Sequence, residues 1–389
     1  MRYKLKDIFD LQMGKTPSRN NSEYWNTEDY KWISIADLGK TGKYISETKE
    51  YLSESAVAES GIKIIPANTV VMSFKLSIGK TAITAEDMYS NEAIMAFHDR
   101  HVIDILPEYI YYMFKYKNWD EGSNKAVMGK TLNKATLSEV EIDICSMEEQ
   151  REIVNVLDKM MAVLEGRETE LALLDNLIKA RFIEMLGNPR INPNKYPTKL
   201  IKDTCIVITG NTPSRKVHEY YGDAIEWIKT DNIVSSLLYP TVASESLSDS
   251  GKAVGRAVDA GAILMACIAG SVASIGRVCI TDREVAFNQQ INAIVPKEYD
   301  VRFLHALLQI SKDYLVEDIN MSLKGIISKS KLEEKEFIVP SMEEQVGFAD
   351  FVKQIDKSKF QKYNATILSH NIYVFETRRR FICKPTLII

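Results

Sequence analysis

The pentapeptide Ser-Met-Glu-Glu-Gln stands at residues 146–150 and returns at residues 341–345. A second motif repeats with almost the same spacing, because Gly-Lys-Thr-Pro-Ser-Arg at 14–19 returns as Gly-Asn-Thr-Pro-Ser-Arg at 210–215. These repeats predict a tandem duplication in which each unit is a compact domain followed by the start of a long helix. A duplicated domain of this kind can contact two separate stretches of one long partner.

The bulk composition is that of an ordinary globular protein with more than one domain. The chain has 389 residues, of which 45% are apolar and 26% are charged, and this length exceeds what one hydrophobic core usually serves. No run approaches the roughly 18 uncharged apolar residues of a membrane span, so no membrane partner is expected. The five cysteines include no Cys-x-x-Cys pair and the residues after Met1 form no signal-peptide core, which predicts a reduced, cytoplasmic protein.

The net charge of −4 counts mildly against binding to nucleic acid. Free-standing DNA binders are usually basic, because neutralising phosphates supplies much of their affinity. This objection weakens if the chain shares its DNA with a basic partner, or confines its lysines and arginines to one face. Net charge alone therefore does not decide the ligand.

Each unit is predicted to have a mixed α/β fold of the α+β class, with mainly antiparallel or mixed sheet. In the first unit the expected elements are two strands within 62–74, strands at 81–83 and 93–97, and a helix over 106–117. In the second unit they are strands at 261–268, at 278–280 and after Asn288, and a helix over 300–315. Trp32 and Trp227 occupy equivalent positions and are expected in the two cores rather than on a base-stacking surface.

A long helix is predicted after each domain. Ser146 with Glu149, and Ser341 with Glu344, fit the capping box, in which the Ser hydroxyl accepts from the third helical N–H and the Glu side chain accepts from the Ser N–H. After the first start, residues recur at alternating steps of four and three, a spacing typical of a coiled-coil stripe. The stripe comprises Ile153, Leu157, Met160, Leu164, Arg167, Leu171, Leu174, Ile178, Arg181 and Met185. The helix is expected to end at Gly187.

A helix of this length is a rod of roughly 60 Å, and its apolar stripe needs a partner. The second long helix is the obvious candidate, because a matching stripe begins with Phe348, Val352 and Ile355. Lys359 and Lys362 take the next two stripe positions, so a good match is expected only over the first few turns. The tail after the second helix contains Pro385 and cannot remain regular helix.

The sequence contains no phosphate-binding or dinucleotide-binding loop. Gly-Lys-Thr triplets occur at 14–16, 79–81 and 129–131, but none has the earlier Gly that a phosphate loop requires. No Gly-x-Gly-x-x-Gly follows a predicted strand, which argues against a Rossmann site for a dinucleotide or a methyl donor.

No catalytic or metal-binding set of side chains is predicted either. His98 and His101 are interpreted as surface or loop residues, because no Cys or carboxylate set accompanies them. Cys267 and Cys279 lie in apolar strands and are interpreted as core residues rather than nucleophiles.

The order of these motifs resembles the specificity subunit of type I restriction–modification systems, and the resemblance covers essentially the whole chain. The order includes a Ser-Ile-Gly-Lys/Arg turn in each unit, and its most specific elements are Gly-x-Thr-Pro-Ser-Arg near the start of each unit, Trp-Ile at 32 and 227, and Ile-Val-Pro at 338–340 leading into Ser-Met-Glu-Glu-Gln. The chain departs from the pattern at Cys145, where the other copy has Pro340, and in the interrupted stripe of its second long helix.

The resemblance implies a chain that is not itself an enzyme. Each domain would be a target-recognition domain that reads one half of a bipartite, asymmetric double-stranded DNA target. The long helices would pack antiparallel as a ruler with pseudo-twofold symmetry and dock two adenine methyltransferase (modification) subunits. Those subunits would carry S-adenosylmethionine, and restriction or translocase subunits would use ATP and Mg²⁺, so no cofactor is expected in this chain. The implied domains are 1–145, 146–187 (central helix), 188–340 and 341–389 (second helix and tail).

Exposed polar residues in loops are the candidates for DNA contacts, because Arg, Lys, Asn, Gln, Ser and Thr read base edges, while Lys and Arg also bind phosphates. In the first unit the candidates are Lys15, Thr16, Ser18, Arg19, Lys75, Lys80, Lys130 and Lys134. In the second unit they are Asn211, Thr212, Ser214, Arg215, Asp231, Asn232, Ser271, Arg277, Lys324 and Lys329. Each could instead form a turn, and Thr-Pro-Ser-Arg in particular could be conformational because both copies keep it.

Two other functions fit the same sequence. A free-standing, two-headed DNA-binding regulator would bind a specific duplex tightly by itself, whereas a specificity subunit would bind tightly only with its modification subunits. A coiled-coil adaptor for other proteins would have no affinity for DNA under any condition. An enzyme is the least favoured interpretation because the motifs that it would need are missing.

Overall fold

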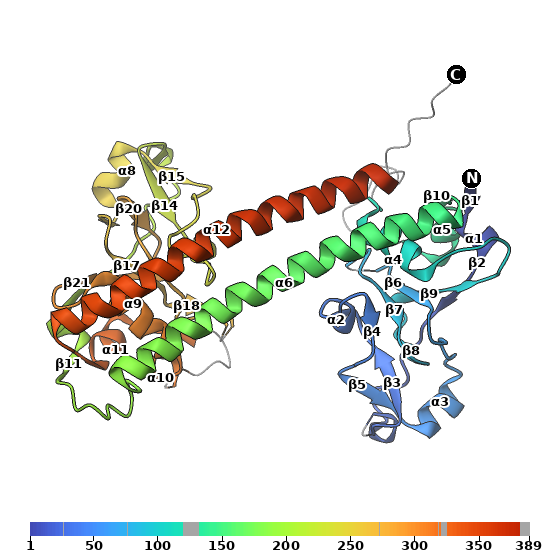
Figure 1. Cartoon of the computed structure of the whole chain (residues 1–389), viewed down its shortest axis with the longest axis horizontal. Coiled ribbons are helices and arrows are strands. Elements are labelled where there is room, and N and C mark those ends of the chain that lie inside the picture. The colour runs from blue at the N-terminus through green and yellow to red at the C-terminus, as the bar shows by residue number, and fades with distance from the viewer. Residues whose placement is uncertain are drawn as a thin grey trace. The chain divides into compact units, whose positions relative to one another are not determined.

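The computed structural model describes residues 1–25, 27–75, 77–119, 132–271, 273–317, 319 and 325–381. The chain folds into two compact units: unit 1 comprises residues 1–166 and 365–389, and unit 2 comprises residues 167–364. The long helices α6 (Met147–Leu186) and α12 (Met342–Phe381), green and red in Figure 1, each pass from one unit into the other. Each unit therefore holds one globular domain with the start of one long helix and the end of the other.

The described residues of unit 1 form three sheets. The largest has the strand order β2 (Phe9–Met13), β9 (Ile94–Asp99), β6 (Val70–Ser73), β7 (Thr81–Thr84) and β4 (Tyr44–Ile45). The second has the order β5 (Glu50–Leu52), β3 (Tyr30–Ile33) and β8 (Tyr89–Ser90), and the third pairs β1 (Arg2–Lys4) with β10 (Glu141–Asp143). The helices of this domain are α1 (Leu5–Ile8), α2 (Ile35–Leu38), α3 (Glu54–Ser60), α4 (Pro107–Tyr116), α5 (Lys134–Ser138) and the 3-10 helix η1 (Ser22–Tyr24).

Unit 2 repeats this plan. Its four-stranded sheet has the order β12 (Cys205–Thr209), β21 (Ile291–Pro296), β17 (Ile263–Ala266) and β19 (Val278–Ile280). A five-stranded sheet has the order β13 (Tyr221–Gly222), β15 (Ser246–Leu247), β14 (Ile225–Ile228), β20 (Val285–Phe287) and β16 (Ala257–Val258). The strands β11 (Thr198–Leu200) and β23 (Glu336–Ile338) form one pair, and β18 (Ile268–Ala269) and β22 (Gly325–Ile326) form another.

The helices of the second domain are α7 (Ile201–Thr204), α8 (Asp249–Val254), α9 (Val301–Ile310), α10 (Lys312–Val316) and α11 (Lys329–Glu333), with the 3-10 helices η2 (His218–Tyr220) and η3 (Thr230–Asn232). The two domains agree in detail: β3 pairs in parallel with β8 as β14 does with β20, and the main sheets share the antiparallel order β2-β9-β6-β7 and β12-β21-β17-β19. The mixed α/β fold and the internal duplication are therefore confirmed.

Both long helices start as predicted. Ser146 N–H donates to Glu149 Oε2 at 3.1 Å while Glu149 N–H donates to Ser146 Oγ at 3.3 Å. Ser341 and Glu344 repeat these bonds at 3.0 and 3.3 Å. The helix α6 ends before Gly187, whose φ of 77° is left-handed and whose missing Cβ leaves room for the ring of Pro193.

Each domain core extends onto the long helices. In unit 1, a buried cluster joins the main sheet and α4 to Ile153, Leu157 and Leu164 of α6 and to Tyr373 of α12. In unit 2, the corresponding cluster joins the sheet and α9 to Ile178, Phe182 and Leu186 of α6 and to Phe348 and Val352 of α12. The apolar stripe therefore serves the domain cores at its ends as well as the other helix.

The two long helices run antiparallel within unit 2. Lys359 of α12 forms an ion pair with Asp175 of α6, and Lys362 forms one with Glu170, both with N–O distances of 2.6 Å. Residue numbers rise along α12 as they fall along α6, which defines the direction. The contact between the two helices therefore continues past the few turns that the apolar pattern predicts, because the lysines at stripe positions form ion pairs with carboxylates on the facing helix.

Two predicted elements differ from the structure. The segment 62–74 contains one strand, β6, and only an isolated bridge from Ile65 to Met88, because Pro66 to Thr69 turn the chain. The predicted helix over 300–315 is two helices, α9 and α10, separated at Ser311. The predicted domain boundaries stay a prediction, since the compact units divide each long helix near its middle.

Candidate nucleic-acid interface

The repeated hexapeptide forms the same turn in both domains. Gly14 and Gly210 begin the turns, and each lies against the backbone at the end of a neighbouring strand. A Cβ on Gly14 would overlap the carbonyl oxygen of Ser90, and one on Gly210 would overlap that of Phe287. Only glycine fits at these positions, so the motif begins with a requirement of packing.

A buried tryptophan in each domain forms a hydrogen bond to the backbone of this turn. Trp32 Nε1–H donates to the carbonyl oxygen of Lys15 at 3.1 Å, and Trp227 Nε1–H donates to that of Asn211 at 3.3 Å. Both indole rings are buried, which confirms the prediction that they are core residues. The turn is therefore fixed by a buried hydrogen bond in each unit.

The arginines that close the motif are also engaged. The guanidinium carbon of Arg19 lies 4.9 Å from the ring centroid of its tryptophan, and that of Arg215 lies 5.0 Å from its own. Each arginine forms an ion pair, with Glu50 at 2.5 Å and with Glu245 at 2.6 Å. These contacts favour a conformational role for both arginines, although about half of each side chain remains exposed.

The two threonines are bonded in the same way. Thr16 Oγ1–H donates to the carboxylate of Glu92, and Thr212 Oγ1–H donates to the amide oxygen of Gln289. The bond from Thr16 is the largest of the effects that hold the pKa of Glu92 below its usual value. Both hydroxyls stabilise the turn, so neither is a free group for reading bases in this structure.

The other candidates in the first turn are more open. The ammonium of Lys15 donates to the carbonyl oxygen of Ser60, and the Asn211 amide donates to a backbone carbonyl oxygen at 2.9 Å. Ser18 and Ser214 are exposed. Lys15, Ser18 and Ser214 are therefore the members of the two hexapeptides that remain best placed to meet a ligand.

Three segments of unit 1 come together around Lys80. Its ammonium lies beside Gly39, and Trp119 lies beside Gly79. Lys75 stands on the same loop as Lys80, and neither lysine has an ion-pair partner in the described part of the chain. We refer to Gly39, Lys75, Gly79, Lys80 and Trp119 as the unit 1 loop cluster, and it presents two ammonium groups, of which that of Lys75 also interacts electrostatically with the Glu92 carboxylate.

An equivalent arrangement exists in unit 2. Arg277, the counterpart of Lys80, donates to the carbonyl oxygens of Ser274 and Thr230, both at 3.1 Å. Lys312 of α10 donates to the carbonyl oxygen of Ala273 at 3.0 Å. Burial lowers the pKa of Lys312, and the neighbouring Arg277 charge lowers it further. We refer to these five residues as the unit 2 loop cluster.

Three more candidates lie near the unit 2 loop cluster. Asn232 caps η3, because its side chain accepts from the Lys229 N–H at 3.0 Å and donates to Thr241 Oγ1 at 3.0 Å. Ser271 Oγ–H donates to Ser274 Oγ at 2.9 Å. Asp231 is exposed. Asn232 is thus held by the fold, whereas Asp231 is accessible.

The remaining candidates precede the short helices near the end of each domain. Lys130 and Lys324 lie outside the described residues. Lys134 is the first residue of α5 and is exposed, and Lys329 is the first residue of α11, where it lies 3.5 Å from Glu333. The assignment of any single residue to a DNA contact stays a prediction.

Sequence reasoning missed Lys312, because it lies on a helix with no repeated motif and approaches Arg277 only in the folded domain. It also missed the role of the glutamine in Ser-Met-Glu-Glu-Gln. Gln150 Oε1 accepts from the Leu106 N–H and Gln345 Oε1 accepts from the Asp300 N–H, both at 2.9 Å. Each amide nitrogen donates to two further backbone carbonyls at 3.0–3.2 Å. This buried clamp joins each long helix to α4 or α9.

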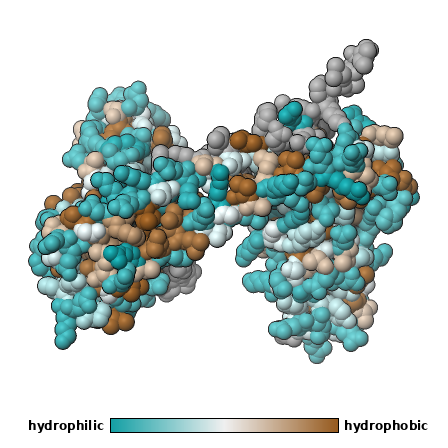
Figure 2. Space-filling view, viewed as in Figure 1, coloured by the Kyte–Doolittle hydropathy of each residue, from teal (hydrophilic) through white to brown (hydrophobic). Residues whose placement is uncertain are grey.

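The residues predicted to pair the helices are placed as follows. Ile153, Leu157, Leu164, Ile178, Phe348 and Val352 are buried, while Met160, Leu171, Leu174 and Ile355 are half-buried. Other apolar side chains of α6 in unit 2 remain exposed, notably Leu173 and Leu177 at 60% and 45%. Figure 2 shows brown apolar surface gathered over the part of unit 2 where Figure 1 draws the long helices. This surface is available to a partner.

Burial is the largest influence on the protonation of the buried cysteines and histidine. Burial raises the pKa of Cys267 and of Cys279 to about 12, so both are neutral thiols in the core, as predicted. Burial lowers the pKa of His305 to about 4, so this imidazole is neutral at physiological pH. Within the described residues, no three His, Cys, Asp or Glu side chains gather in a way that could hold a metal ion.

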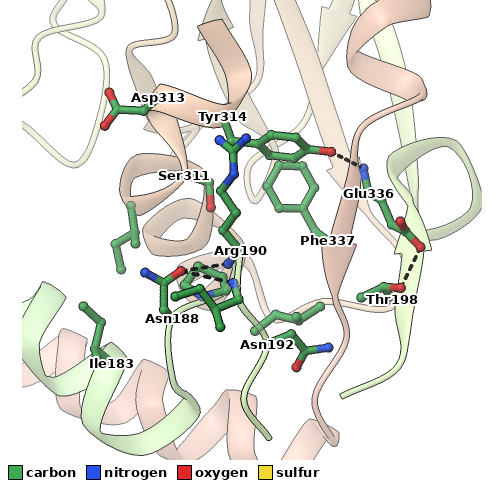
Figure 3. A pocket seen from close by; sticks show the side chains of 14 residues that line it. Ile183, Asn188, Arg190, Asn192, Thr198, Ser311, Asp313, Tyr314, Glu336 and Phe337 are labelled. Carbon is green, nitrogen blue, oxygen red and sulfur yellow. Dashed lines mark hydrogen bonds between the residues drawn. The ribbon is translucent and has the colours of Figure 1, made fainter. Parts of the chain in front are cut away.

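A hollow beside the C-terminal end of α6 in unit 2 has a structural explanation (Figure 3). Asn188 Oδ1 accepts from the Arg190 N–H at 2.9 Å, and the Arg190 guanidinium forms an ion pair with Glu317 at 2.5 Å. Tyr314 accepts from the Glu336 N–H at 3.2 Å. The Thr198 hydroxyl donates to the Glu336 carboxylate at 2.6 Å. Together these bonds fix the polar side chains of the lining and the turn after the helix.

None of the described helices combines the length and the apolar character that crossing a membrane would require.

Comparison with known proteins decides the family. The family model described as "Type I restriction modification DNA specificity domain" matches residues 1–173 and 193–368. The chain belongs to this family. The two matched segments correspond to the two repeats that the sequence and the folds of units 1 and 2 reveal independently.

Individual members of the type I specificity family agree with this assignment. The chain is 30% identical over 258 residues to the type I restriction enzyme MjaIX specificity subunit of Methanocaldococcus jannaschii, which covers 60% of this chain and 58% of that protein. The match thus spans less than two thirds of that relative. A solved S subunit of a type I system from M. genitalium has a TM-score of 0.51 at 12% identity, covering 99% of this chain and 96% of the other.

A second solved structure, concerned with complex assembly and conformational transition of the type I R-M system, has a TM-score of 0.58 at 14% identity. It covers 98% of this chain and 97% of the other. At these identities the structural likeness shows the fold alone. The type I specificity fold, with its two recognition domains and long helices, therefore spans this chain.

Proposed function

We propose that this chain is the non-catalytic DNA specificity subunit of a type I restriction–modification complex. Each globular domain reads one half of a bipartite double-stranded target, and the long helices set the separation of the two halves and dock modification subunits. One observation carries the proposal. Both units contain the same three parts in the same order, namely a recognition domain, a glutamine clamp and a capped long helix.

The loop clusters support DNA as the ligand. Each repeat brings cationic side chains together: Lys75 and Lys80 lie on one loop of unit 1, and in unit 2 Arg277 lies close to Lys312 of α10. Lysine and arginine on loops are the groups that bind phosphates and read guanine edges. The net charge of −4 is compatible with this ligand, because it is a sum over the whole chain, and a few cations grouped on each domain are enough to contact phosphates.

The divergence between the loop clusters supports an asymmetric target. The fold of the two domains is the same, yet Lys75 of unit 1 has no lysine counterpart beside Ser271 in unit 2. Different side chains at equivalent places select different bases. We expect two unlike half-sites, separated by a spacer near one or more turns of B-DNA, about 34 Å each.

The exposed apolar surface of α6 supports docking of a partner protein. Contiguous apolar surface on a monomer marks an interaction site, and Leu173 and Leu177 lie on a long helix rather than in a domain core. We assign this surface to two adenine methyltransferase subunits, which would supply S-adenosylmethionine, while restriction subunits would supply ATP-driven translocation and cleavage with Mg²⁺. The complex would act on DNA in the cytoplasm.

The proposal is tested by measuring DNA binding with and without the partners. The purified chain should bind a target duplex weakly, and addition of the modification subunits should tighten binding by at least a hundredfold. Tight, specific binding by the chain alone would instead identify a free-standing regulator. No binding in either condition would identify a protein adaptor.

A further inference from the structure

The two units share one fold but differ in how the space between the globular domain and the long helices is filled. The equivalence of the surrounding residues is fixed by shared hydrogen bonds. Ile83 N–H donates to the carbonyl oxygen of Lys43 at 2.9 Å, and Ile280 N–H donates to that of Leu238 at 2.8 Å. Lys43 and Leu238 therefore occupy the same position in the two domains.

Two further equivalences follow from the glutamine clamps. The amides of Leu106 and Asp300 bond to the clamp glutamines, so α4 and α9 are in register. Six residues further along, Tyr112 of unit 1 corresponds to Ala306 of unit 2. Counting from the repeated pentapeptides, Asp158 of α6 corresponds to Lys353 of α12, and Tyr373 of α12 corresponds to Ile178 of α6.

In unit 1 this place is filled. The ammonium of Lys43 forms an ion pair with Asp158 at 2.7 Å, and the Tyr112 hydroxyl donates to the same carboxylate. Tyr373 packs edge-on to Tyr116 with ring centroids 5.3 Å apart. Both Tyr112 and Tyr373 are fully buried. Two aromatic rings and one ion pair thus close the space between the domain and the long helices.

In unit 2 the same place is a cavity of about 430 Å³. Leu238, Ala306, Lys353 and Ile178, the counterparts of the four residues that fill it in unit 1, all line it. The change from tyrosine to alanine and from tyrosine to isoleucine removes two rings. The change from aspartate to lysine removes the carboxylate that the ion pair needs, so the opening follows directly from the sequence differences.

The cavity has an apolar floor and a positive rim. Ile178, Ala306 and Val352 contribute buried apolar surface. Arg302 and Lys359 are neutralised by ion pairs with Asp356 and Asp175. Lys353 and Lys357 are exposed and have no ion-pair partner in the described part of the chain, so the rim carries uncompensated positive charge.

We propose that this cavity receives an aromatic side chain, flanked by an acidic residue, from the modification subunit that docks on unit 2. Unit 1 shows the occupant that suits this space, because its own Tyr112 fills it. The acidic neighbour is required by charge complementarity with Lys353 and Lys357. This inference rests on the proposed function, since it names a contact of the same docking surface.

One consequence is that the two modification subunits meet unlike sites. The surface of unit 1 is closed by its own tyrosines, whereas that of unit 2 is completed by the partner. A buried aromatic anchor in a pocket is the usual form of an interface hot spot. The modification subunit on unit 2 therefore makes a contact that unit 1 does not offer, although the partner is the same protein at both sites.

The decisive variant fills the cavity from within. In Ala306→Tyr the new ring occupies the space as Tyr112 does in unit 1. Titration of the full-length variant with purified modification subunit, followed by calorimetry and mass photometry, should show one binding event as in the unchanged chain and one weakened at least tenfold. Two unchanged events would overturn the inference while leaving the proposed function intact.

A second variant tests the rim without touching the core. Lys353→Glu with Lys357→Glu reverses two exposed charges, so it decides the question even if Ala306→Tyr fails to fold. It should weaken the same binding event about tenfold, and more at low than at high salt. The matched control is Lys202→Glu, an exposed lysine of α7 in the same unit, which should leave both events unchanged.

The remaining outcomes are separable. If the unchanged chain binds no modification subunit, the proposed function and this inference both fail. If the double charge reversal weakens binding of a DNA duplex to the chain alone and leaves assembly unchanged, the rim contacts nucleic acid and the inference is wrong. Equal losses in the Lys202→Glu control would show a general charge effect and would also overturn it.

Discussion

Lys359 of α12 and Asp175 of α6 form an ion pair with an Nζ–Oδ1 distance of 2.6 Å, and Lys359 stands at a stripe position where a coiled coil would normally place an apolar side chain. Only 17% of the Lys359 side chain is exposed. The pair ties the two long helices together at one register, because a shift by one turn would leave a poorly hydrated ammonium without its partner.

The Lys359–Asp175 pair predicts a measurable coupling between the helices. Because Asp175 is 45% exposed, the interaction is partly screened by water and should contribute about 1 kcal/mol. A double-mutant cycle with Lys359→Ala and Asp175→Ala, measured by denaturant unfolding of the full chain, should give this coupling energy. Independent, additive effects of the two substitutions would contradict the assignment.

The buried clamp predicts a large effect from one glutamine. Gln345 makes three hydrogen bonds to backbone groups and is almost fully buried. Gln345→Ala leaves those groups unsatisfied and should lower the free energy of unfolding by about 2–4 kcal/mol. Gln354→Ala, on the exposed side of the same helix, is the control and should change it by less than about 0.5 kcal/mol.

The turn motif predicts that its first glycine is required for packing rather than for DNA contact. Gly14→Ala places a methyl group against two backbone carbonyl oxygens and should destabilise unit 1 by about 1–3 kcal/mol. Gly42→Ala meets no atom within 4 Å and should be nearly neutral. Equal melting temperatures for the two variants would show that the turn can relax without cost.

His305 predicts a pH dependence of stability. Its pKa in the folded chain is about 4, below the ordinary value of 6.5, because burial disfavours the charged imidazole. Between pH 6.5 and 4 the unfolded chain therefore binds the proton more readily than the folded chain does. The free energy of unfolding keeps its full value above pH 6.5 and falls as the pH drops through this window, by roughly 3 kcal/mol for this residue. His305→Gln should flatten the unfolding curve in that range, whereas the control His101→Gln, whose side chain is 86% exposed, should not.

Lys80 predicts a pure binding effect. It has no ion-pair partner in the described part of the chain, so Lys80→Ala should leave the melting temperature unchanged. If its ammonium holds a phosphate, the variant should bind target DNA more weakly in the assembled complex and reduce the slope of log K against log salt by about 1. An unchanged slope would remove Lys80 from the interface.

Features set by local pattern could be predicted from the sequence. The capping boxes at Ser146 and Ser341, the end of α6 at Gly187 and the burial of Trp32 and Trp227 each depend on short-range spacing or on an obvious repeat. The Ser311 break between α9 and α10 was missed, because Lys312 to Val316 keep helical apolar spacing and nothing in that spacing marks a change of direction.

Features set by distant partners could not be predicted. From the sequence alone, Lys359 interrupts an apolar stripe, and only the structure shows that it pairs with Asp175 of the facing helix. Gln345 is likewise expected at the surface, because its bond with the Asp300 N–H is formed only in the folded domain. For the DNA interface, the sequence identified loops that carry open cations, such as Lys75 and Lys80. It also nominated Thr16, Arg19 and other motif residues that the structure shows engaged in the turn itself.

The most direct test of the central claim is methylome sequencing of cells that carry the complete system with residues 1–145 exchanged for the first domain of another specificity subunit. If each unit reads one half of the target independently, the methylated sequence should change in one half-site and keep the other half-site and the spacer. A change in both half-sites, or in the spacer alone, would contradict the account.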